Sequence, residues 1–528
     1  MGGSFSSQPT NSSQETPEKD AAKRSYVEEL LNRDDDNDSI DPKEPETSEE
    51  DASLTIDLRG YVDQFPFENL VFEGGGAKGV AYPGAIQALE ELGLMRKIKR
   101  FAGTSIGSIT ACLAALGYNS QKIREVLEKD FRSFYDARLG QLSLLPNMVF
   151  HLGWQPMNTL YEFLGELVKE KLGNKDATFQ DLYIKTGKEL CIVVMNVNNL
   201  EEEYFHLKTT PNVPLRVAMR MSASLPGLMQ PVHYSISGQK SLYMDGGILA
   251  NYPISCFDGW WLSMKKEDSF YKRLQPMEKI PYIMDKRHRF ARDESTAAKT
   301  LGFVLYGENE QQSFRAVYES RQKRRVVYPD TNMGRKAAQR MKNEMKLRKE
   351  HALIKDAINK FIELSSKFDE NSDATISRDE LTAILNDKSF TESDKERLFG
   401  KGVTVEDVIN RLDKDGNGKL NFQEVVTFIE EMGFAVVNCS HGFDRQEVTT
   451  LLSLIQTIYT GLSCNLTQVG ISSKDLSRTV GINTHYIGTT VFDYEKEDVH
   501  FLNKESYKST MAFLKYFVDT NMKPKETQ

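Results

Sequence analysis

The sequence predicts an α/β protein with a doubly wound, mainly parallel sheet, helices on both of its faces, and an inserted all-α lobe. An apolar strand, a glycine-rich turn and a helix follow one another at residues 67–93 and again at 100–116. Residues 190–197 form an apolar run typical of a buried parallel strand. After residue 310, polar helices and two acidic loops replace the strands. Strands that alternate with helices favour a sheet whose functional groups collect at the carboxyl ends of strands.

The chain of 528 residues is long enough for two or three domains, and its 39% hydrophobic content suits a globular core. The net charge of -9 conceals blocks of opposite sign, because residues 34–51 are acidic and residues 321–351 are basic. Five cysteines lie far apart and favour buried free thiols over a disulfide or zinc framework: Cys112, Cys191, Cys256, Cys439 and Cys464. No apolar run reaches the roughly 20 residues that span a bilayer, and no secretory signal is visible. We therefore expect an intracellular protein.

Residues 1–60 are expected to form a disordered acidic tail, because they are rich in Ser, Thr, Pro, Asp and Glu and poor in aromatic residues. The first residues fit the short M-G-x-x-x-[ST] pattern for N-myristoylation at Gly2. One myristoyl chain binds membranes only marginally, so a second signal would be needed. The acidic block would repel an anionic membrane, which means that this signal has to lie elsewhere.

The chain is organised around the turn Gly103-Thr104-Ser105-Ile106-Gly107, which follows a short apolar strand and precedes a helix of small and apolar residues. Glycines on either side of Ser105 let strand and helix pack closely and leave the hydroxyl exposed. The helix N-terminus behind it favours a developing negative charge. A nucleophilic serine is one interpretation, and an ordinary glycine-rich turn is the other.

A second glycine-rich turn, Gly74-Gly75-Gly76-Ala77-Lys78-Gly79, precedes a helix predicted from about Val80 to Gly93. Three successive glycines can present several N–H groups to one point, as in an anion cradle or an oxyanion hole. A phosphate-binding P-loop does not fit, because Lys78 comes before the last glycine and no Ser or Thr follows it. A dinucleotide site fits the glycine spacing, but the next elements lead to the serine turn and not to a ribose-binding acid.

Two later segments complete a set of four motifs. Residues 218–231 are predicted to form a helix ended by prolines, and contain Ser222-Ala223-Ser224-Leu225-Pro226. Residues 242–248 are predicted to form a strand that ends in Asp245-Gly246-Gly247, before Asn251-Tyr252-Pro253. In this order, the four motifs resemble the landmarks of the patatin-like phospholipases over residues 65–310 and 436–520.

The resemblance implies a patatin-like fold, with Ser105 as the nucleophile and Asp245 as its partner in a Ser-Asp dyad. It also implies an oxyanion hole built from the glycine loop: Gly74, Gly75, Gly76, Ala77, Lys78 and Gly79. The remaining residues of the serine turn would form the nucleophile elbow: Gly103, Thr104, Ile106 and Gly107. Two departures from the family are Lys78, where Arg is usual, and Met229, where an aromatic residue is common, and neither removes a catalytic group.

A carboxylate can serve as the base for a serine if a partly dry site raises its pKa and the oxyanion hole supplies most of the stabilisation. A Ser-His-Asp triad stays open, because three histidines follow Asp245 in the order required: His441, His485 and His500. Surface or structural roles are the simpler interpretation of all three.

The loop from Asp413 to Glu424 matches the EF-hand pattern throughout, with Gly418 at position 6, Leu420 at position 8 and a glutamate at position 12. Its predicted calcium ligands are Asp413, Asp415, Asn417, Lys419, Asn421 and Glu424. An earlier loop offers Asp369, Asn371, Asp373, Thr375, Ser377 and Glu380, but has Ala374 at position 6, where a left-handed conformation costs about 1–2 kcal/mol. EF-hands usually work in pairs, so we predict a short ribbon through Ile376 and Leu420. Calcium would be regulatory or structural, and not catalytic.

The basic helical stretch 311–365 separates the first part of the predicted catalytic domain from the EF-hand pair at 366–435. Its most basic portion, 334–351, has three interpretations. It could lie on an anionic membrane as the second signal, dock in a groove of the EF-hand lobe, or form a solvated linker helix.

Residues 436–520 are predicted to complete the catalytic domain, before a tail at 521–528. A helix is expected at 451–462, strands within 477–492 and a closing helix from about 504 to 518. The first part of the same domain is expected to end with a strand at 300–307.

Together these motifs lead us to expect a calcium-regulated phospholipid acyl-ester hydrolase that releases fatty acids. We expect it in the cytoplasm, at the surface of phospholipid membranes, acting on fatty-acyl esters and without a nucleic-acid partner. The alternatives are a transacylase or a neutral-lipid lipase on the same fold, and a non-catalytic, calcium-dependent membrane-binding module.

Overall fold

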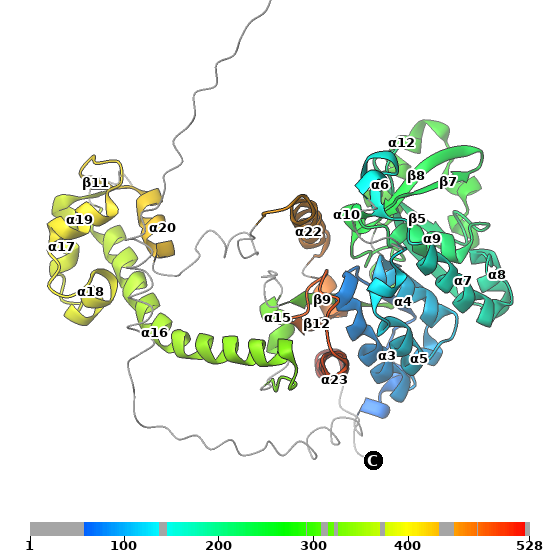
Figure 1. Ribbon diagram of the computed structural model, residues 1–528, viewed down its shortest axis with the longest axis horizontal. Helices are drawn as coiled ribbons and strands as arrows, with labels where there is room; N and C mark the ends of the chain where they lie inside the picture. The colour runs from blue at the N-terminus through cyan, green and yellow to red at the C-terminus, as the bar shows by residue number, and fades with distance from the viewer. Residues whose placement is uncertain are drawn as a thin grey trace, which may run out of the picture. The chain divides into compact units, whose positions relative to one another are not determined.

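The computed structural model describes residues 58–136, 145–291, 293–307, 315–321, 326–369, 375–431, 448–472 and 474–522. Nearly all of the predicted N-terminal tail, including Gly2, and most of the C-terminal tail lie outside these residues. The described part of the chain forms an α/β unit around one large sheet, and a lobe of helices (Figure 1).

The large sheet has eight strands in the order β12-β9-β1-β2-β4-β8-β7, with β5 also paired to β4. Neighbours from β12 to β4 run parallel, whereas β5, β7 and β8 are antiparallel to their partners. The strands are β1 (Asn69–Phe72), β2 (Arg100–Thr104), β4 (Glu189–Asn196), β5 (Glu201–His206), β7 (Val232–Ile236), β8 (Gln239–Asp245), β9 (Thr300–Gly307) and β12 (Thr479–His485). The mainly parallel α/β sheet is therefore confirmed, and β9 is the strand expected at 300–307.

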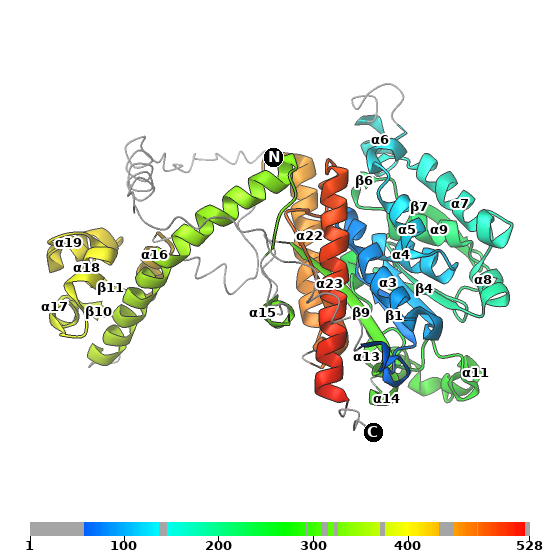
Figure 2. The ribbon, with the colours of Figure 1, turned by 90° about the horizontal axis from the view of Figure 1, so that it is seen from below.

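Alternate residues of the buried strands pack into two cores. In β4, Leu190 and Ile192 belong to a cluster with residues of helices α3, α4 and α23, whereas Cys191 and Val193 belong to a cluster on the other face. Helices cover the first face: α3 (Tyr82–Glu91), α4 (Ile106–Ala115), α5 (Ser120–Leu127), α7 (Asn158–Leu172), α8 (Phe179–Thr186), α9 (Leu215–Ser222) and α23 (Lys496–Asn521). Helix α23 packs along α3, so a late and an early segment of the chain share one hydrophobic core (Figure 2).

Short elements pack around the second face and the ends of the sheet. They are α6 (Leu145–Phe150), α10 (Gly247–Ala250), α11 (Phe270–Arg273), α12 (Ile280–Met284), α13 (Lys286–Arg289), α14 (Glu294–Ala297) and α15 (Arg315–Ser320). Tyr318 of α15 and Tyr252 are part of the second core, which shows that segments far apart in the chain build this face.

The helix predicted over 218–231 is shorter than expected. Helix α9 ends at Ser222, because Pro226 disfavours helical geometry before it and Gly227 has a φ of +74°. The chain then forms a short strand, β6 (Gly227–Met229), which pairs with β3 (Gly153–Gln155).

The strand predicted at 489–492 is wrong, because these residues form a turn and an irregular segment. The carbonyl of Thr489 accepts the N–H of Ala77 at 2.8 Å instead of joining a sheet. The prediction rested on β-branched residues, which fit a strand only where a neighbouring strand is available.

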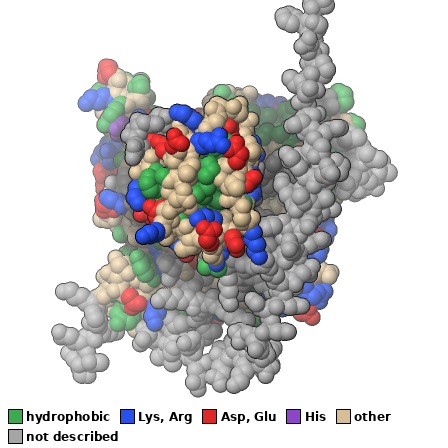
Figure 3. All heavy atoms as spheres, turned by 90° about the vertical axis from the view of Figure 1, so that its left-hand side faces the viewer, with side chains coloured by type: hydrophobic (Ala, Val, Ile, Leu, Met, Phe, Trp, Pro, Cys, Tyr) green, Lys and Arg blue, Asp and Glu red, His purple; other side chains and the backbone are tan. Residues whose placement is uncertain are grey.

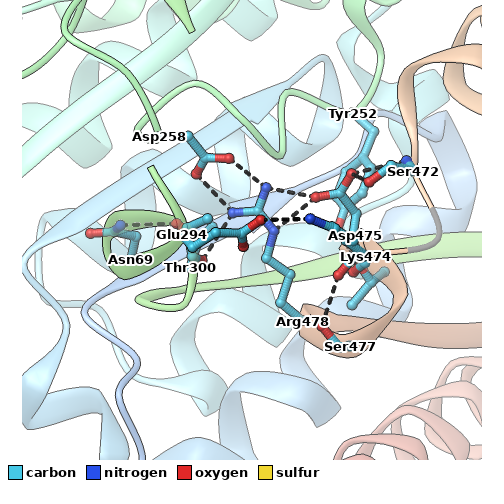
Figure 4. Close-up of polar contacts among 12 residues, drawn as sticks. Asn69, Tyr252, Asp258, Glu294, Thr300, Ser472, Lys474, Asp475, Ser477 and Arg478 are labelled. Atoms are coloured by element: carbon cyan, nitrogen blue, oxygen red, sulfur yellow. Dashed lines mark hydrogen bonds and ion pairs between the residues drawn. The ribbon is translucent and has the colours of Figure 1, made fainter. Parts of the chain in front are cut away.

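Arg478, beside β12, is buried and ties the closing segment to the first part of the α/β unit (Figure 4). Its guanidinium donates to both carboxylate oxygens of Asp258, at 2.7 and 2.6 Å, and to Asp475 at 3.0 and 2.7 Å. These bidentate, charge-assisted bonds satisfy a cation that burial would otherwise destabilise.

The helical lobe contains the C-terminal half of α16 (Asn332–Phe368), then α17 (Arg378–Asn386), α18 (Glu392–Phe399), α19 (Val405–Leu412) and α20 (Phe422–Glu431). Its core includes Phe361, Phe399 and Phe428. Strands β10 (Ile376–Ser377) and β11 (Lys419–Leu420) pair Ile376 with Leu420, which confirms the predicted ribbon. The face of the lobe in Figure 3 carries acidic and basic side chains interspersed around a small apolar centre.

Helix α16 runs without a break across the boundary predicted at residue 365. Its first turn belongs to the α/β unit, because Thr331 Oγ1 donates to Asp498 at 2.5 Å and Ala337 lies in the first core. Docking of residues 334–351 on the EF-hand lobe stays a prediction.

Candidate active site

Ser105 lies in a sharp turn between β2 and α4, with a φ of 54° and a ψ of -128°. A positive φ is rare for a residue other than glycine and marks a strained backbone. The strand and the helix on either side of the turn pack closely, because a Cβ on Gly103 would lie 2.3 Å from the carbonyl carbon of Gly107. The backbone N–H of Ser105 donates to Ser222 Oγ at 2.8 Å, and Ser222 donates to the carbonyl of Val193 at 2.7 Å. The serine turn is thereby held against β4.

Asp245 ends β8 at the same height in the sheet as the serine turn. Strand β4 sets this height, because Thr104 pairs with its Val193 and Asp245 pairs with its Val194. Both groups lie at carboxyl ends of strands, where the sequence favours functional groups, but β8 is antiparallel to β4. The register along β4, and not a common strand direction, brings Ser105 and Asp245 together.

The Asp245 carboxyl group is fully buried. Burial raises its pKa to about 7, and this shift is partly offset by the Ser105 hydroxyl, the Gly247 N–H and the Tyr459 hydroxyl. The Gly247 N–H donates to Oδ1 at 2.7 Å. Within the described residues, Oδ2 makes no hydrogen bond of standard geometry. A carboxylate with this pKa and a spare oxygen can accept a proton near neutral pH.

The glycine loop continues from β1 into a short 3-10 helix, Gly76–Ala81. Three of its N–H groups are already used: those of Gly74, Ala77 and Lys78 donate to the carbonyls of Asn251, Thr489 and Gly75. No hydrogen bond among the described residues uses the N–H of Gly75 or Gly76. These two groups are the best candidates for anion donors among the six residues predicted.

A mostly apolar cavity opens beside Ser105, with about 700 Å³ of space including its mouth. Gly76 and Ala77 line it at the serine end. Its other walls are mainly aliphatic and aromatic: Val80, Ile109, Val126, Leu127, Phe131, Phe134, Leu160, Phe163, Leu164, Leu225, Met229, Phe492 and Tyr494. A cavity with this lining suits a hydrocarbon chain.

A second, more polar cavity of about 350 Å³ lies behind the glycine loop. Glu73, Lys78, Asn251 and Thr489 line it, together with Tyr459, Thr460 and Ser463 of α22 (Leu451–Gly470). Lys78 is 4% exposed, so it is a buried part of this loop and not a surface cation.

Of the three histidines of the alternative triad, the two that the structure describes have other surroundings. His485 is buried against the rings of Tyr328 and Phe501, and burial lowers its pKa to about 4. His500 is exposed on α23, and His441 lies outside the described residues. The described groups that shift the pKa of Asp245 are Ser105, Gly247 and Tyr459, with no histidine among them.

Two residues of the site were missed by the sequence analysis. Ser222 bridges the serine turn and β4, and Tyr459 faces Asp245 from a helix more than 200 residues further along the chain. The Ser222 segment had been noted as a motif without a role. Nothing in the sequence marks Tyr459, because its contact depends on how α22 packs against α10.

In the second predicted calcium loop, carboxylate oxygens of Asp413, Asp415 and Glu424 lie within 4.8 Å of one another. Gly418 has a φ of +78°, as position 6 of the pattern requires. Hard oxygen donors around a tight turn are what Ca²⁺ prefers, so these residues fit the ion. Asn417, Lys419 and Asn421 belong to the same loop, and Asn417 and Asn421 approach Asp415.

The first calcium loop is described only in part. Asn371, Asp373 and Ala374 lie outside the described residues. Glu380 caps α17 by accepting from the N–H and hydroxyl of Ser377, at 2.7 and 2.8 Å. Asp369 and Thr375 flank the undescribed stretch, and ion binding by this loop stays a prediction.

Comparison with known proteins identifies both parts of the chain. Residues 70–258 match the model of the patatin-like phospholipase family, and residues 358–430 match that of the EF-hand domain pair. The chain therefore carries a patatin-like phospholipase domain together with an EF-hand pair.

The protein YqhO of Bacillus subtilis is 32% identical over 198 residues, which cover 35% of this chain and 65% of that protein. The probable lipid hydrolase 463L of invertebrate iridescent virus 6 is 28% identical over 188 residues, covering 36% of this chain and 62% of that protein. The matched region is thus less than two thirds of either relative. Among solved structures, VipD of Legionella pneumophila aligns with 85% of this chain and 67% of its own at 16% identity, with a TM-score of 0.37.

None of the described helices combines the length and the apolar character needed to cross a bilayer.

Proposed function

We propose that this protein is a calcium-regulated serine hydrolase that releases fatty acids from phospholipids. The observation that carries the proposal is the pairing of Ser105 with a buried carboxyl group of raised pKa, at the end of a hydrocarbon-lined cavity. The patatin-like match and the viral relative's description as a probable lipid hydrolase support the same class of substrate.

In this mechanism the acyl chain occupies the apolar cavity, with its ester carbonyl beside Ser105. Asp245 takes the Ser105 proton as Oγ attacks the carbonyl carbon, and the N–H groups of Gly75 and Gly76 stabilise the oxyanion. Collapse of the intermediate breaks the ester bond, and the departing alcohol takes the proton from Asp245. Water then attacks the acyl-enzyme with Asp245 again as base, which releases the fatty acid and restores Ser105.

Calcium would act through the EF-hand lobe, away from the ester. Both covalent connections of the lobe involve elements near the catalytic machinery. Helix α16 begins beside Asp498 and enters the lobe, and α22, which follows the lobe in sequence, carries Tyr459. Calcium binding that orders the loops of the lobe can therefore change the positions of these two helices.

The test is fatty acid release from mixed phospholipid vesicles, with calcium or with a chelator. Ser105→Ala should abolish release, and Ser133→Ala, a change at an exposed serine outside the cavity, should not alter it. Full activity in Ser105→Ala would overturn the nucleophile assignment. Equal rates with calcium and with chelator would remove the regulatory claim.

The same reaction mixtures separate the nearest alternatives. A transacylase would transfer the acyl group to an added alcohol and give little free acid, whereas a neutral-lipid lipase would prefer triacylglycerol emulsions. Vesicle binding without any product would favour a non-catalytic membrane module.

A further inference from the structure

Two stretches of the chain beside the apolar cavity contain no charged residue. Residues 145–161 and 448–473 contain no Lys, Arg, Asp or Glu, although 27% of the whole chain is charged. The first stretch includes α6 and β3, and the second includes all of α22.

The described side chains of helix α22 show the reverse of the usual polarity. Ser463 and Thr467 are buried, on the side that also presents Tyr459 to Asp245. Leucine and isoleucine side chains at four-residue spacing are 40–52% exposed: Leu454, Ile458, Leu462 and Leu466. A helix on a water-facing surface normally turns its apolar stripe toward the core. The stripe of α22 therefore calls for an apolar partner outside the described fold.

The corner between α6 and β3 adds a second apolar surface. Phe150 is 77% exposed, and Leu152 is 57% exposed with a positive φ of 57°. Strand β3 pairs with β6, whose Met229 lines the cavity, and α22 packs against both β6 and α10. The corner and the stripe thus flank the same end of the hydrocarbon-lined cavity.

We propose that these two surfaces form a lipid-binding rim that seats the catalytic unit on phospholipid bilayers. The stripe of α22 and the residues Phe150 and Leu152 would enter the boundary between headgroups and acyl chains. An acyl chain could then pass from the bilayer into the cavity without crossing water. The inference rests on the proposed function for the lipid nature of its partner.

The absence of charge is what favours a bilayer over a protein partner. Protein interfaces carry a polar rim around their apolar centre, and charged side chains there steer the partner. A surface that enters lipid has to exclude charge, because a charged group in the hydrocarbon region is costly. The rim meets this requirement over two separate stretches of the chain.

The experiment measures binding of the full chain, in the Ser105→Ala background, to vesicles of neutral phosphatidylcholine at physiological salt. Adding Phe150→Asp and Ile458→Asp should weaken binding by about 100-fold, since each methylene group kept in water costs roughly fourfold in affinity. The control pair is Ile184→Asp and Leu200→Asp, which are 72% and 77% exposed on the unrelated helix α8 and the β4–β5 turn, and it should bind normally.

Three results would overturn the proposal. The first is failure of the chain with an unmodified rim to bind neutral vesicles. The second is equal vesicle binding by the Phe150→Asp, Ile458→Asp variant. The third is a dimer in solution that dissociates in this variant while vesicle binding stays unchanged. Circular dichroism and the melting temperature of both variants exclude misfolding as the cause of lost binding. Because binding is measured without hydrolysis, rim-dependent binding together with no fatty acid release by the chain that keeps Ser105 would refute the proposed function and leave the rim proposal standing.

Discussion

The raised pKa of Asp245 makes the pH dependence of the reaction a sharp test of the Ser-Asp mechanism. As a general base, Asp245 has to be ionised before it can accept the Ser105 proton. With a pKa of about 7, roughly a tenth of the enzyme is active at pH 6 and nine tenths at pH 8, so the rate should rise about tenfold between them. The assay is fatty acid release from a monomeric short-chain ester, quantified by mass spectrometry at constant ionic strength.

Ionisation of Asp245 should also lower the free energy of unfolding as the pH rises. The folded pKa of about 7 lies above the ordinary 3.8, so the folded state holds its proton over a range where the unfolded state has lost it. The contribution of Asp245 to stability is greatest below its pKa in the unfolded state, and it is lost as the pH rises through its pKa in the folded state. Between pH 5 and pH 8 this amounts to about 2.5 kcal/mol.

Asp245→Asn provides the matched comparison, because its amide can still accept the Gly247 N–H but does not titrate. The variant should lack activity and should keep the stability that the unmodified chain loses between pH 5 and pH 8 in urea unfolding. A rate that is flat from pH 6 to pH 8, or more than a tenth of normal activity in Asp245→Asn, would refute Asp245 as the base.

Three further predictions follow from other contacts. Tyr459→Phe removes a hydroxyl that lowers the pKa of Asp245, so the rise in rate should move to higher pH, and an unchanged profile would show that the hydroxyl has no effect on the base. Asp258→Ala leaves Arg478 buried with one partner fewer and should cost about 3 kcal/mol in urea unfolding, whereas Glu125→Ala, in a surface pair with Lys122, should cost far less. Glu424→Gln should weaken calcium binding by about 100-fold in calorimetry, since even outer-shell substitutions commonly cost roughly 10- to 100-fold, and normal affinity would argue against this loop as the site.

Local motifs were readable from the sequence because their geometry depends on neighbouring residues. The serine turn needs small residues on either side of Ser105, and the second calcium loop needs Gly418 at one position and oxygen ligands at others. The β10–β11 ribbon followed from the apolar residues Ile376 and Leu420 at matching places in two loops. In each case a few adjacent residues determine the backbone.

Features that depend on distant parts of the chain were not readable. Strand β8 runs antiparallel to both β4 and β7, and its pairing with β4 leaves Asp245 opposite Val194. The segment at 489–492 has the composition of a strand, but the carbonyl of Thr489 accepts the N–H of Ala77 in the glycine loop and the segment pairs with no strand among the described residues.

Helix α22 shows most clearly what periodicity leaves open. The helix expected at 451–462 is present and continues to Gly470, and the usual rule would turn the stripe of Leu454, Ile458, Leu462 and Leu466 inward. The structure turns it outward, because the inner side of the helix meets the polar cavity and Asp245, where Tyr459 and Ser463 fit and leucines would leave polar groups without partners. A hydrophobic stripe therefore indicates that a helix has an apolar partner, and the environment of its opposite side determines whether the stripe can face the protein core.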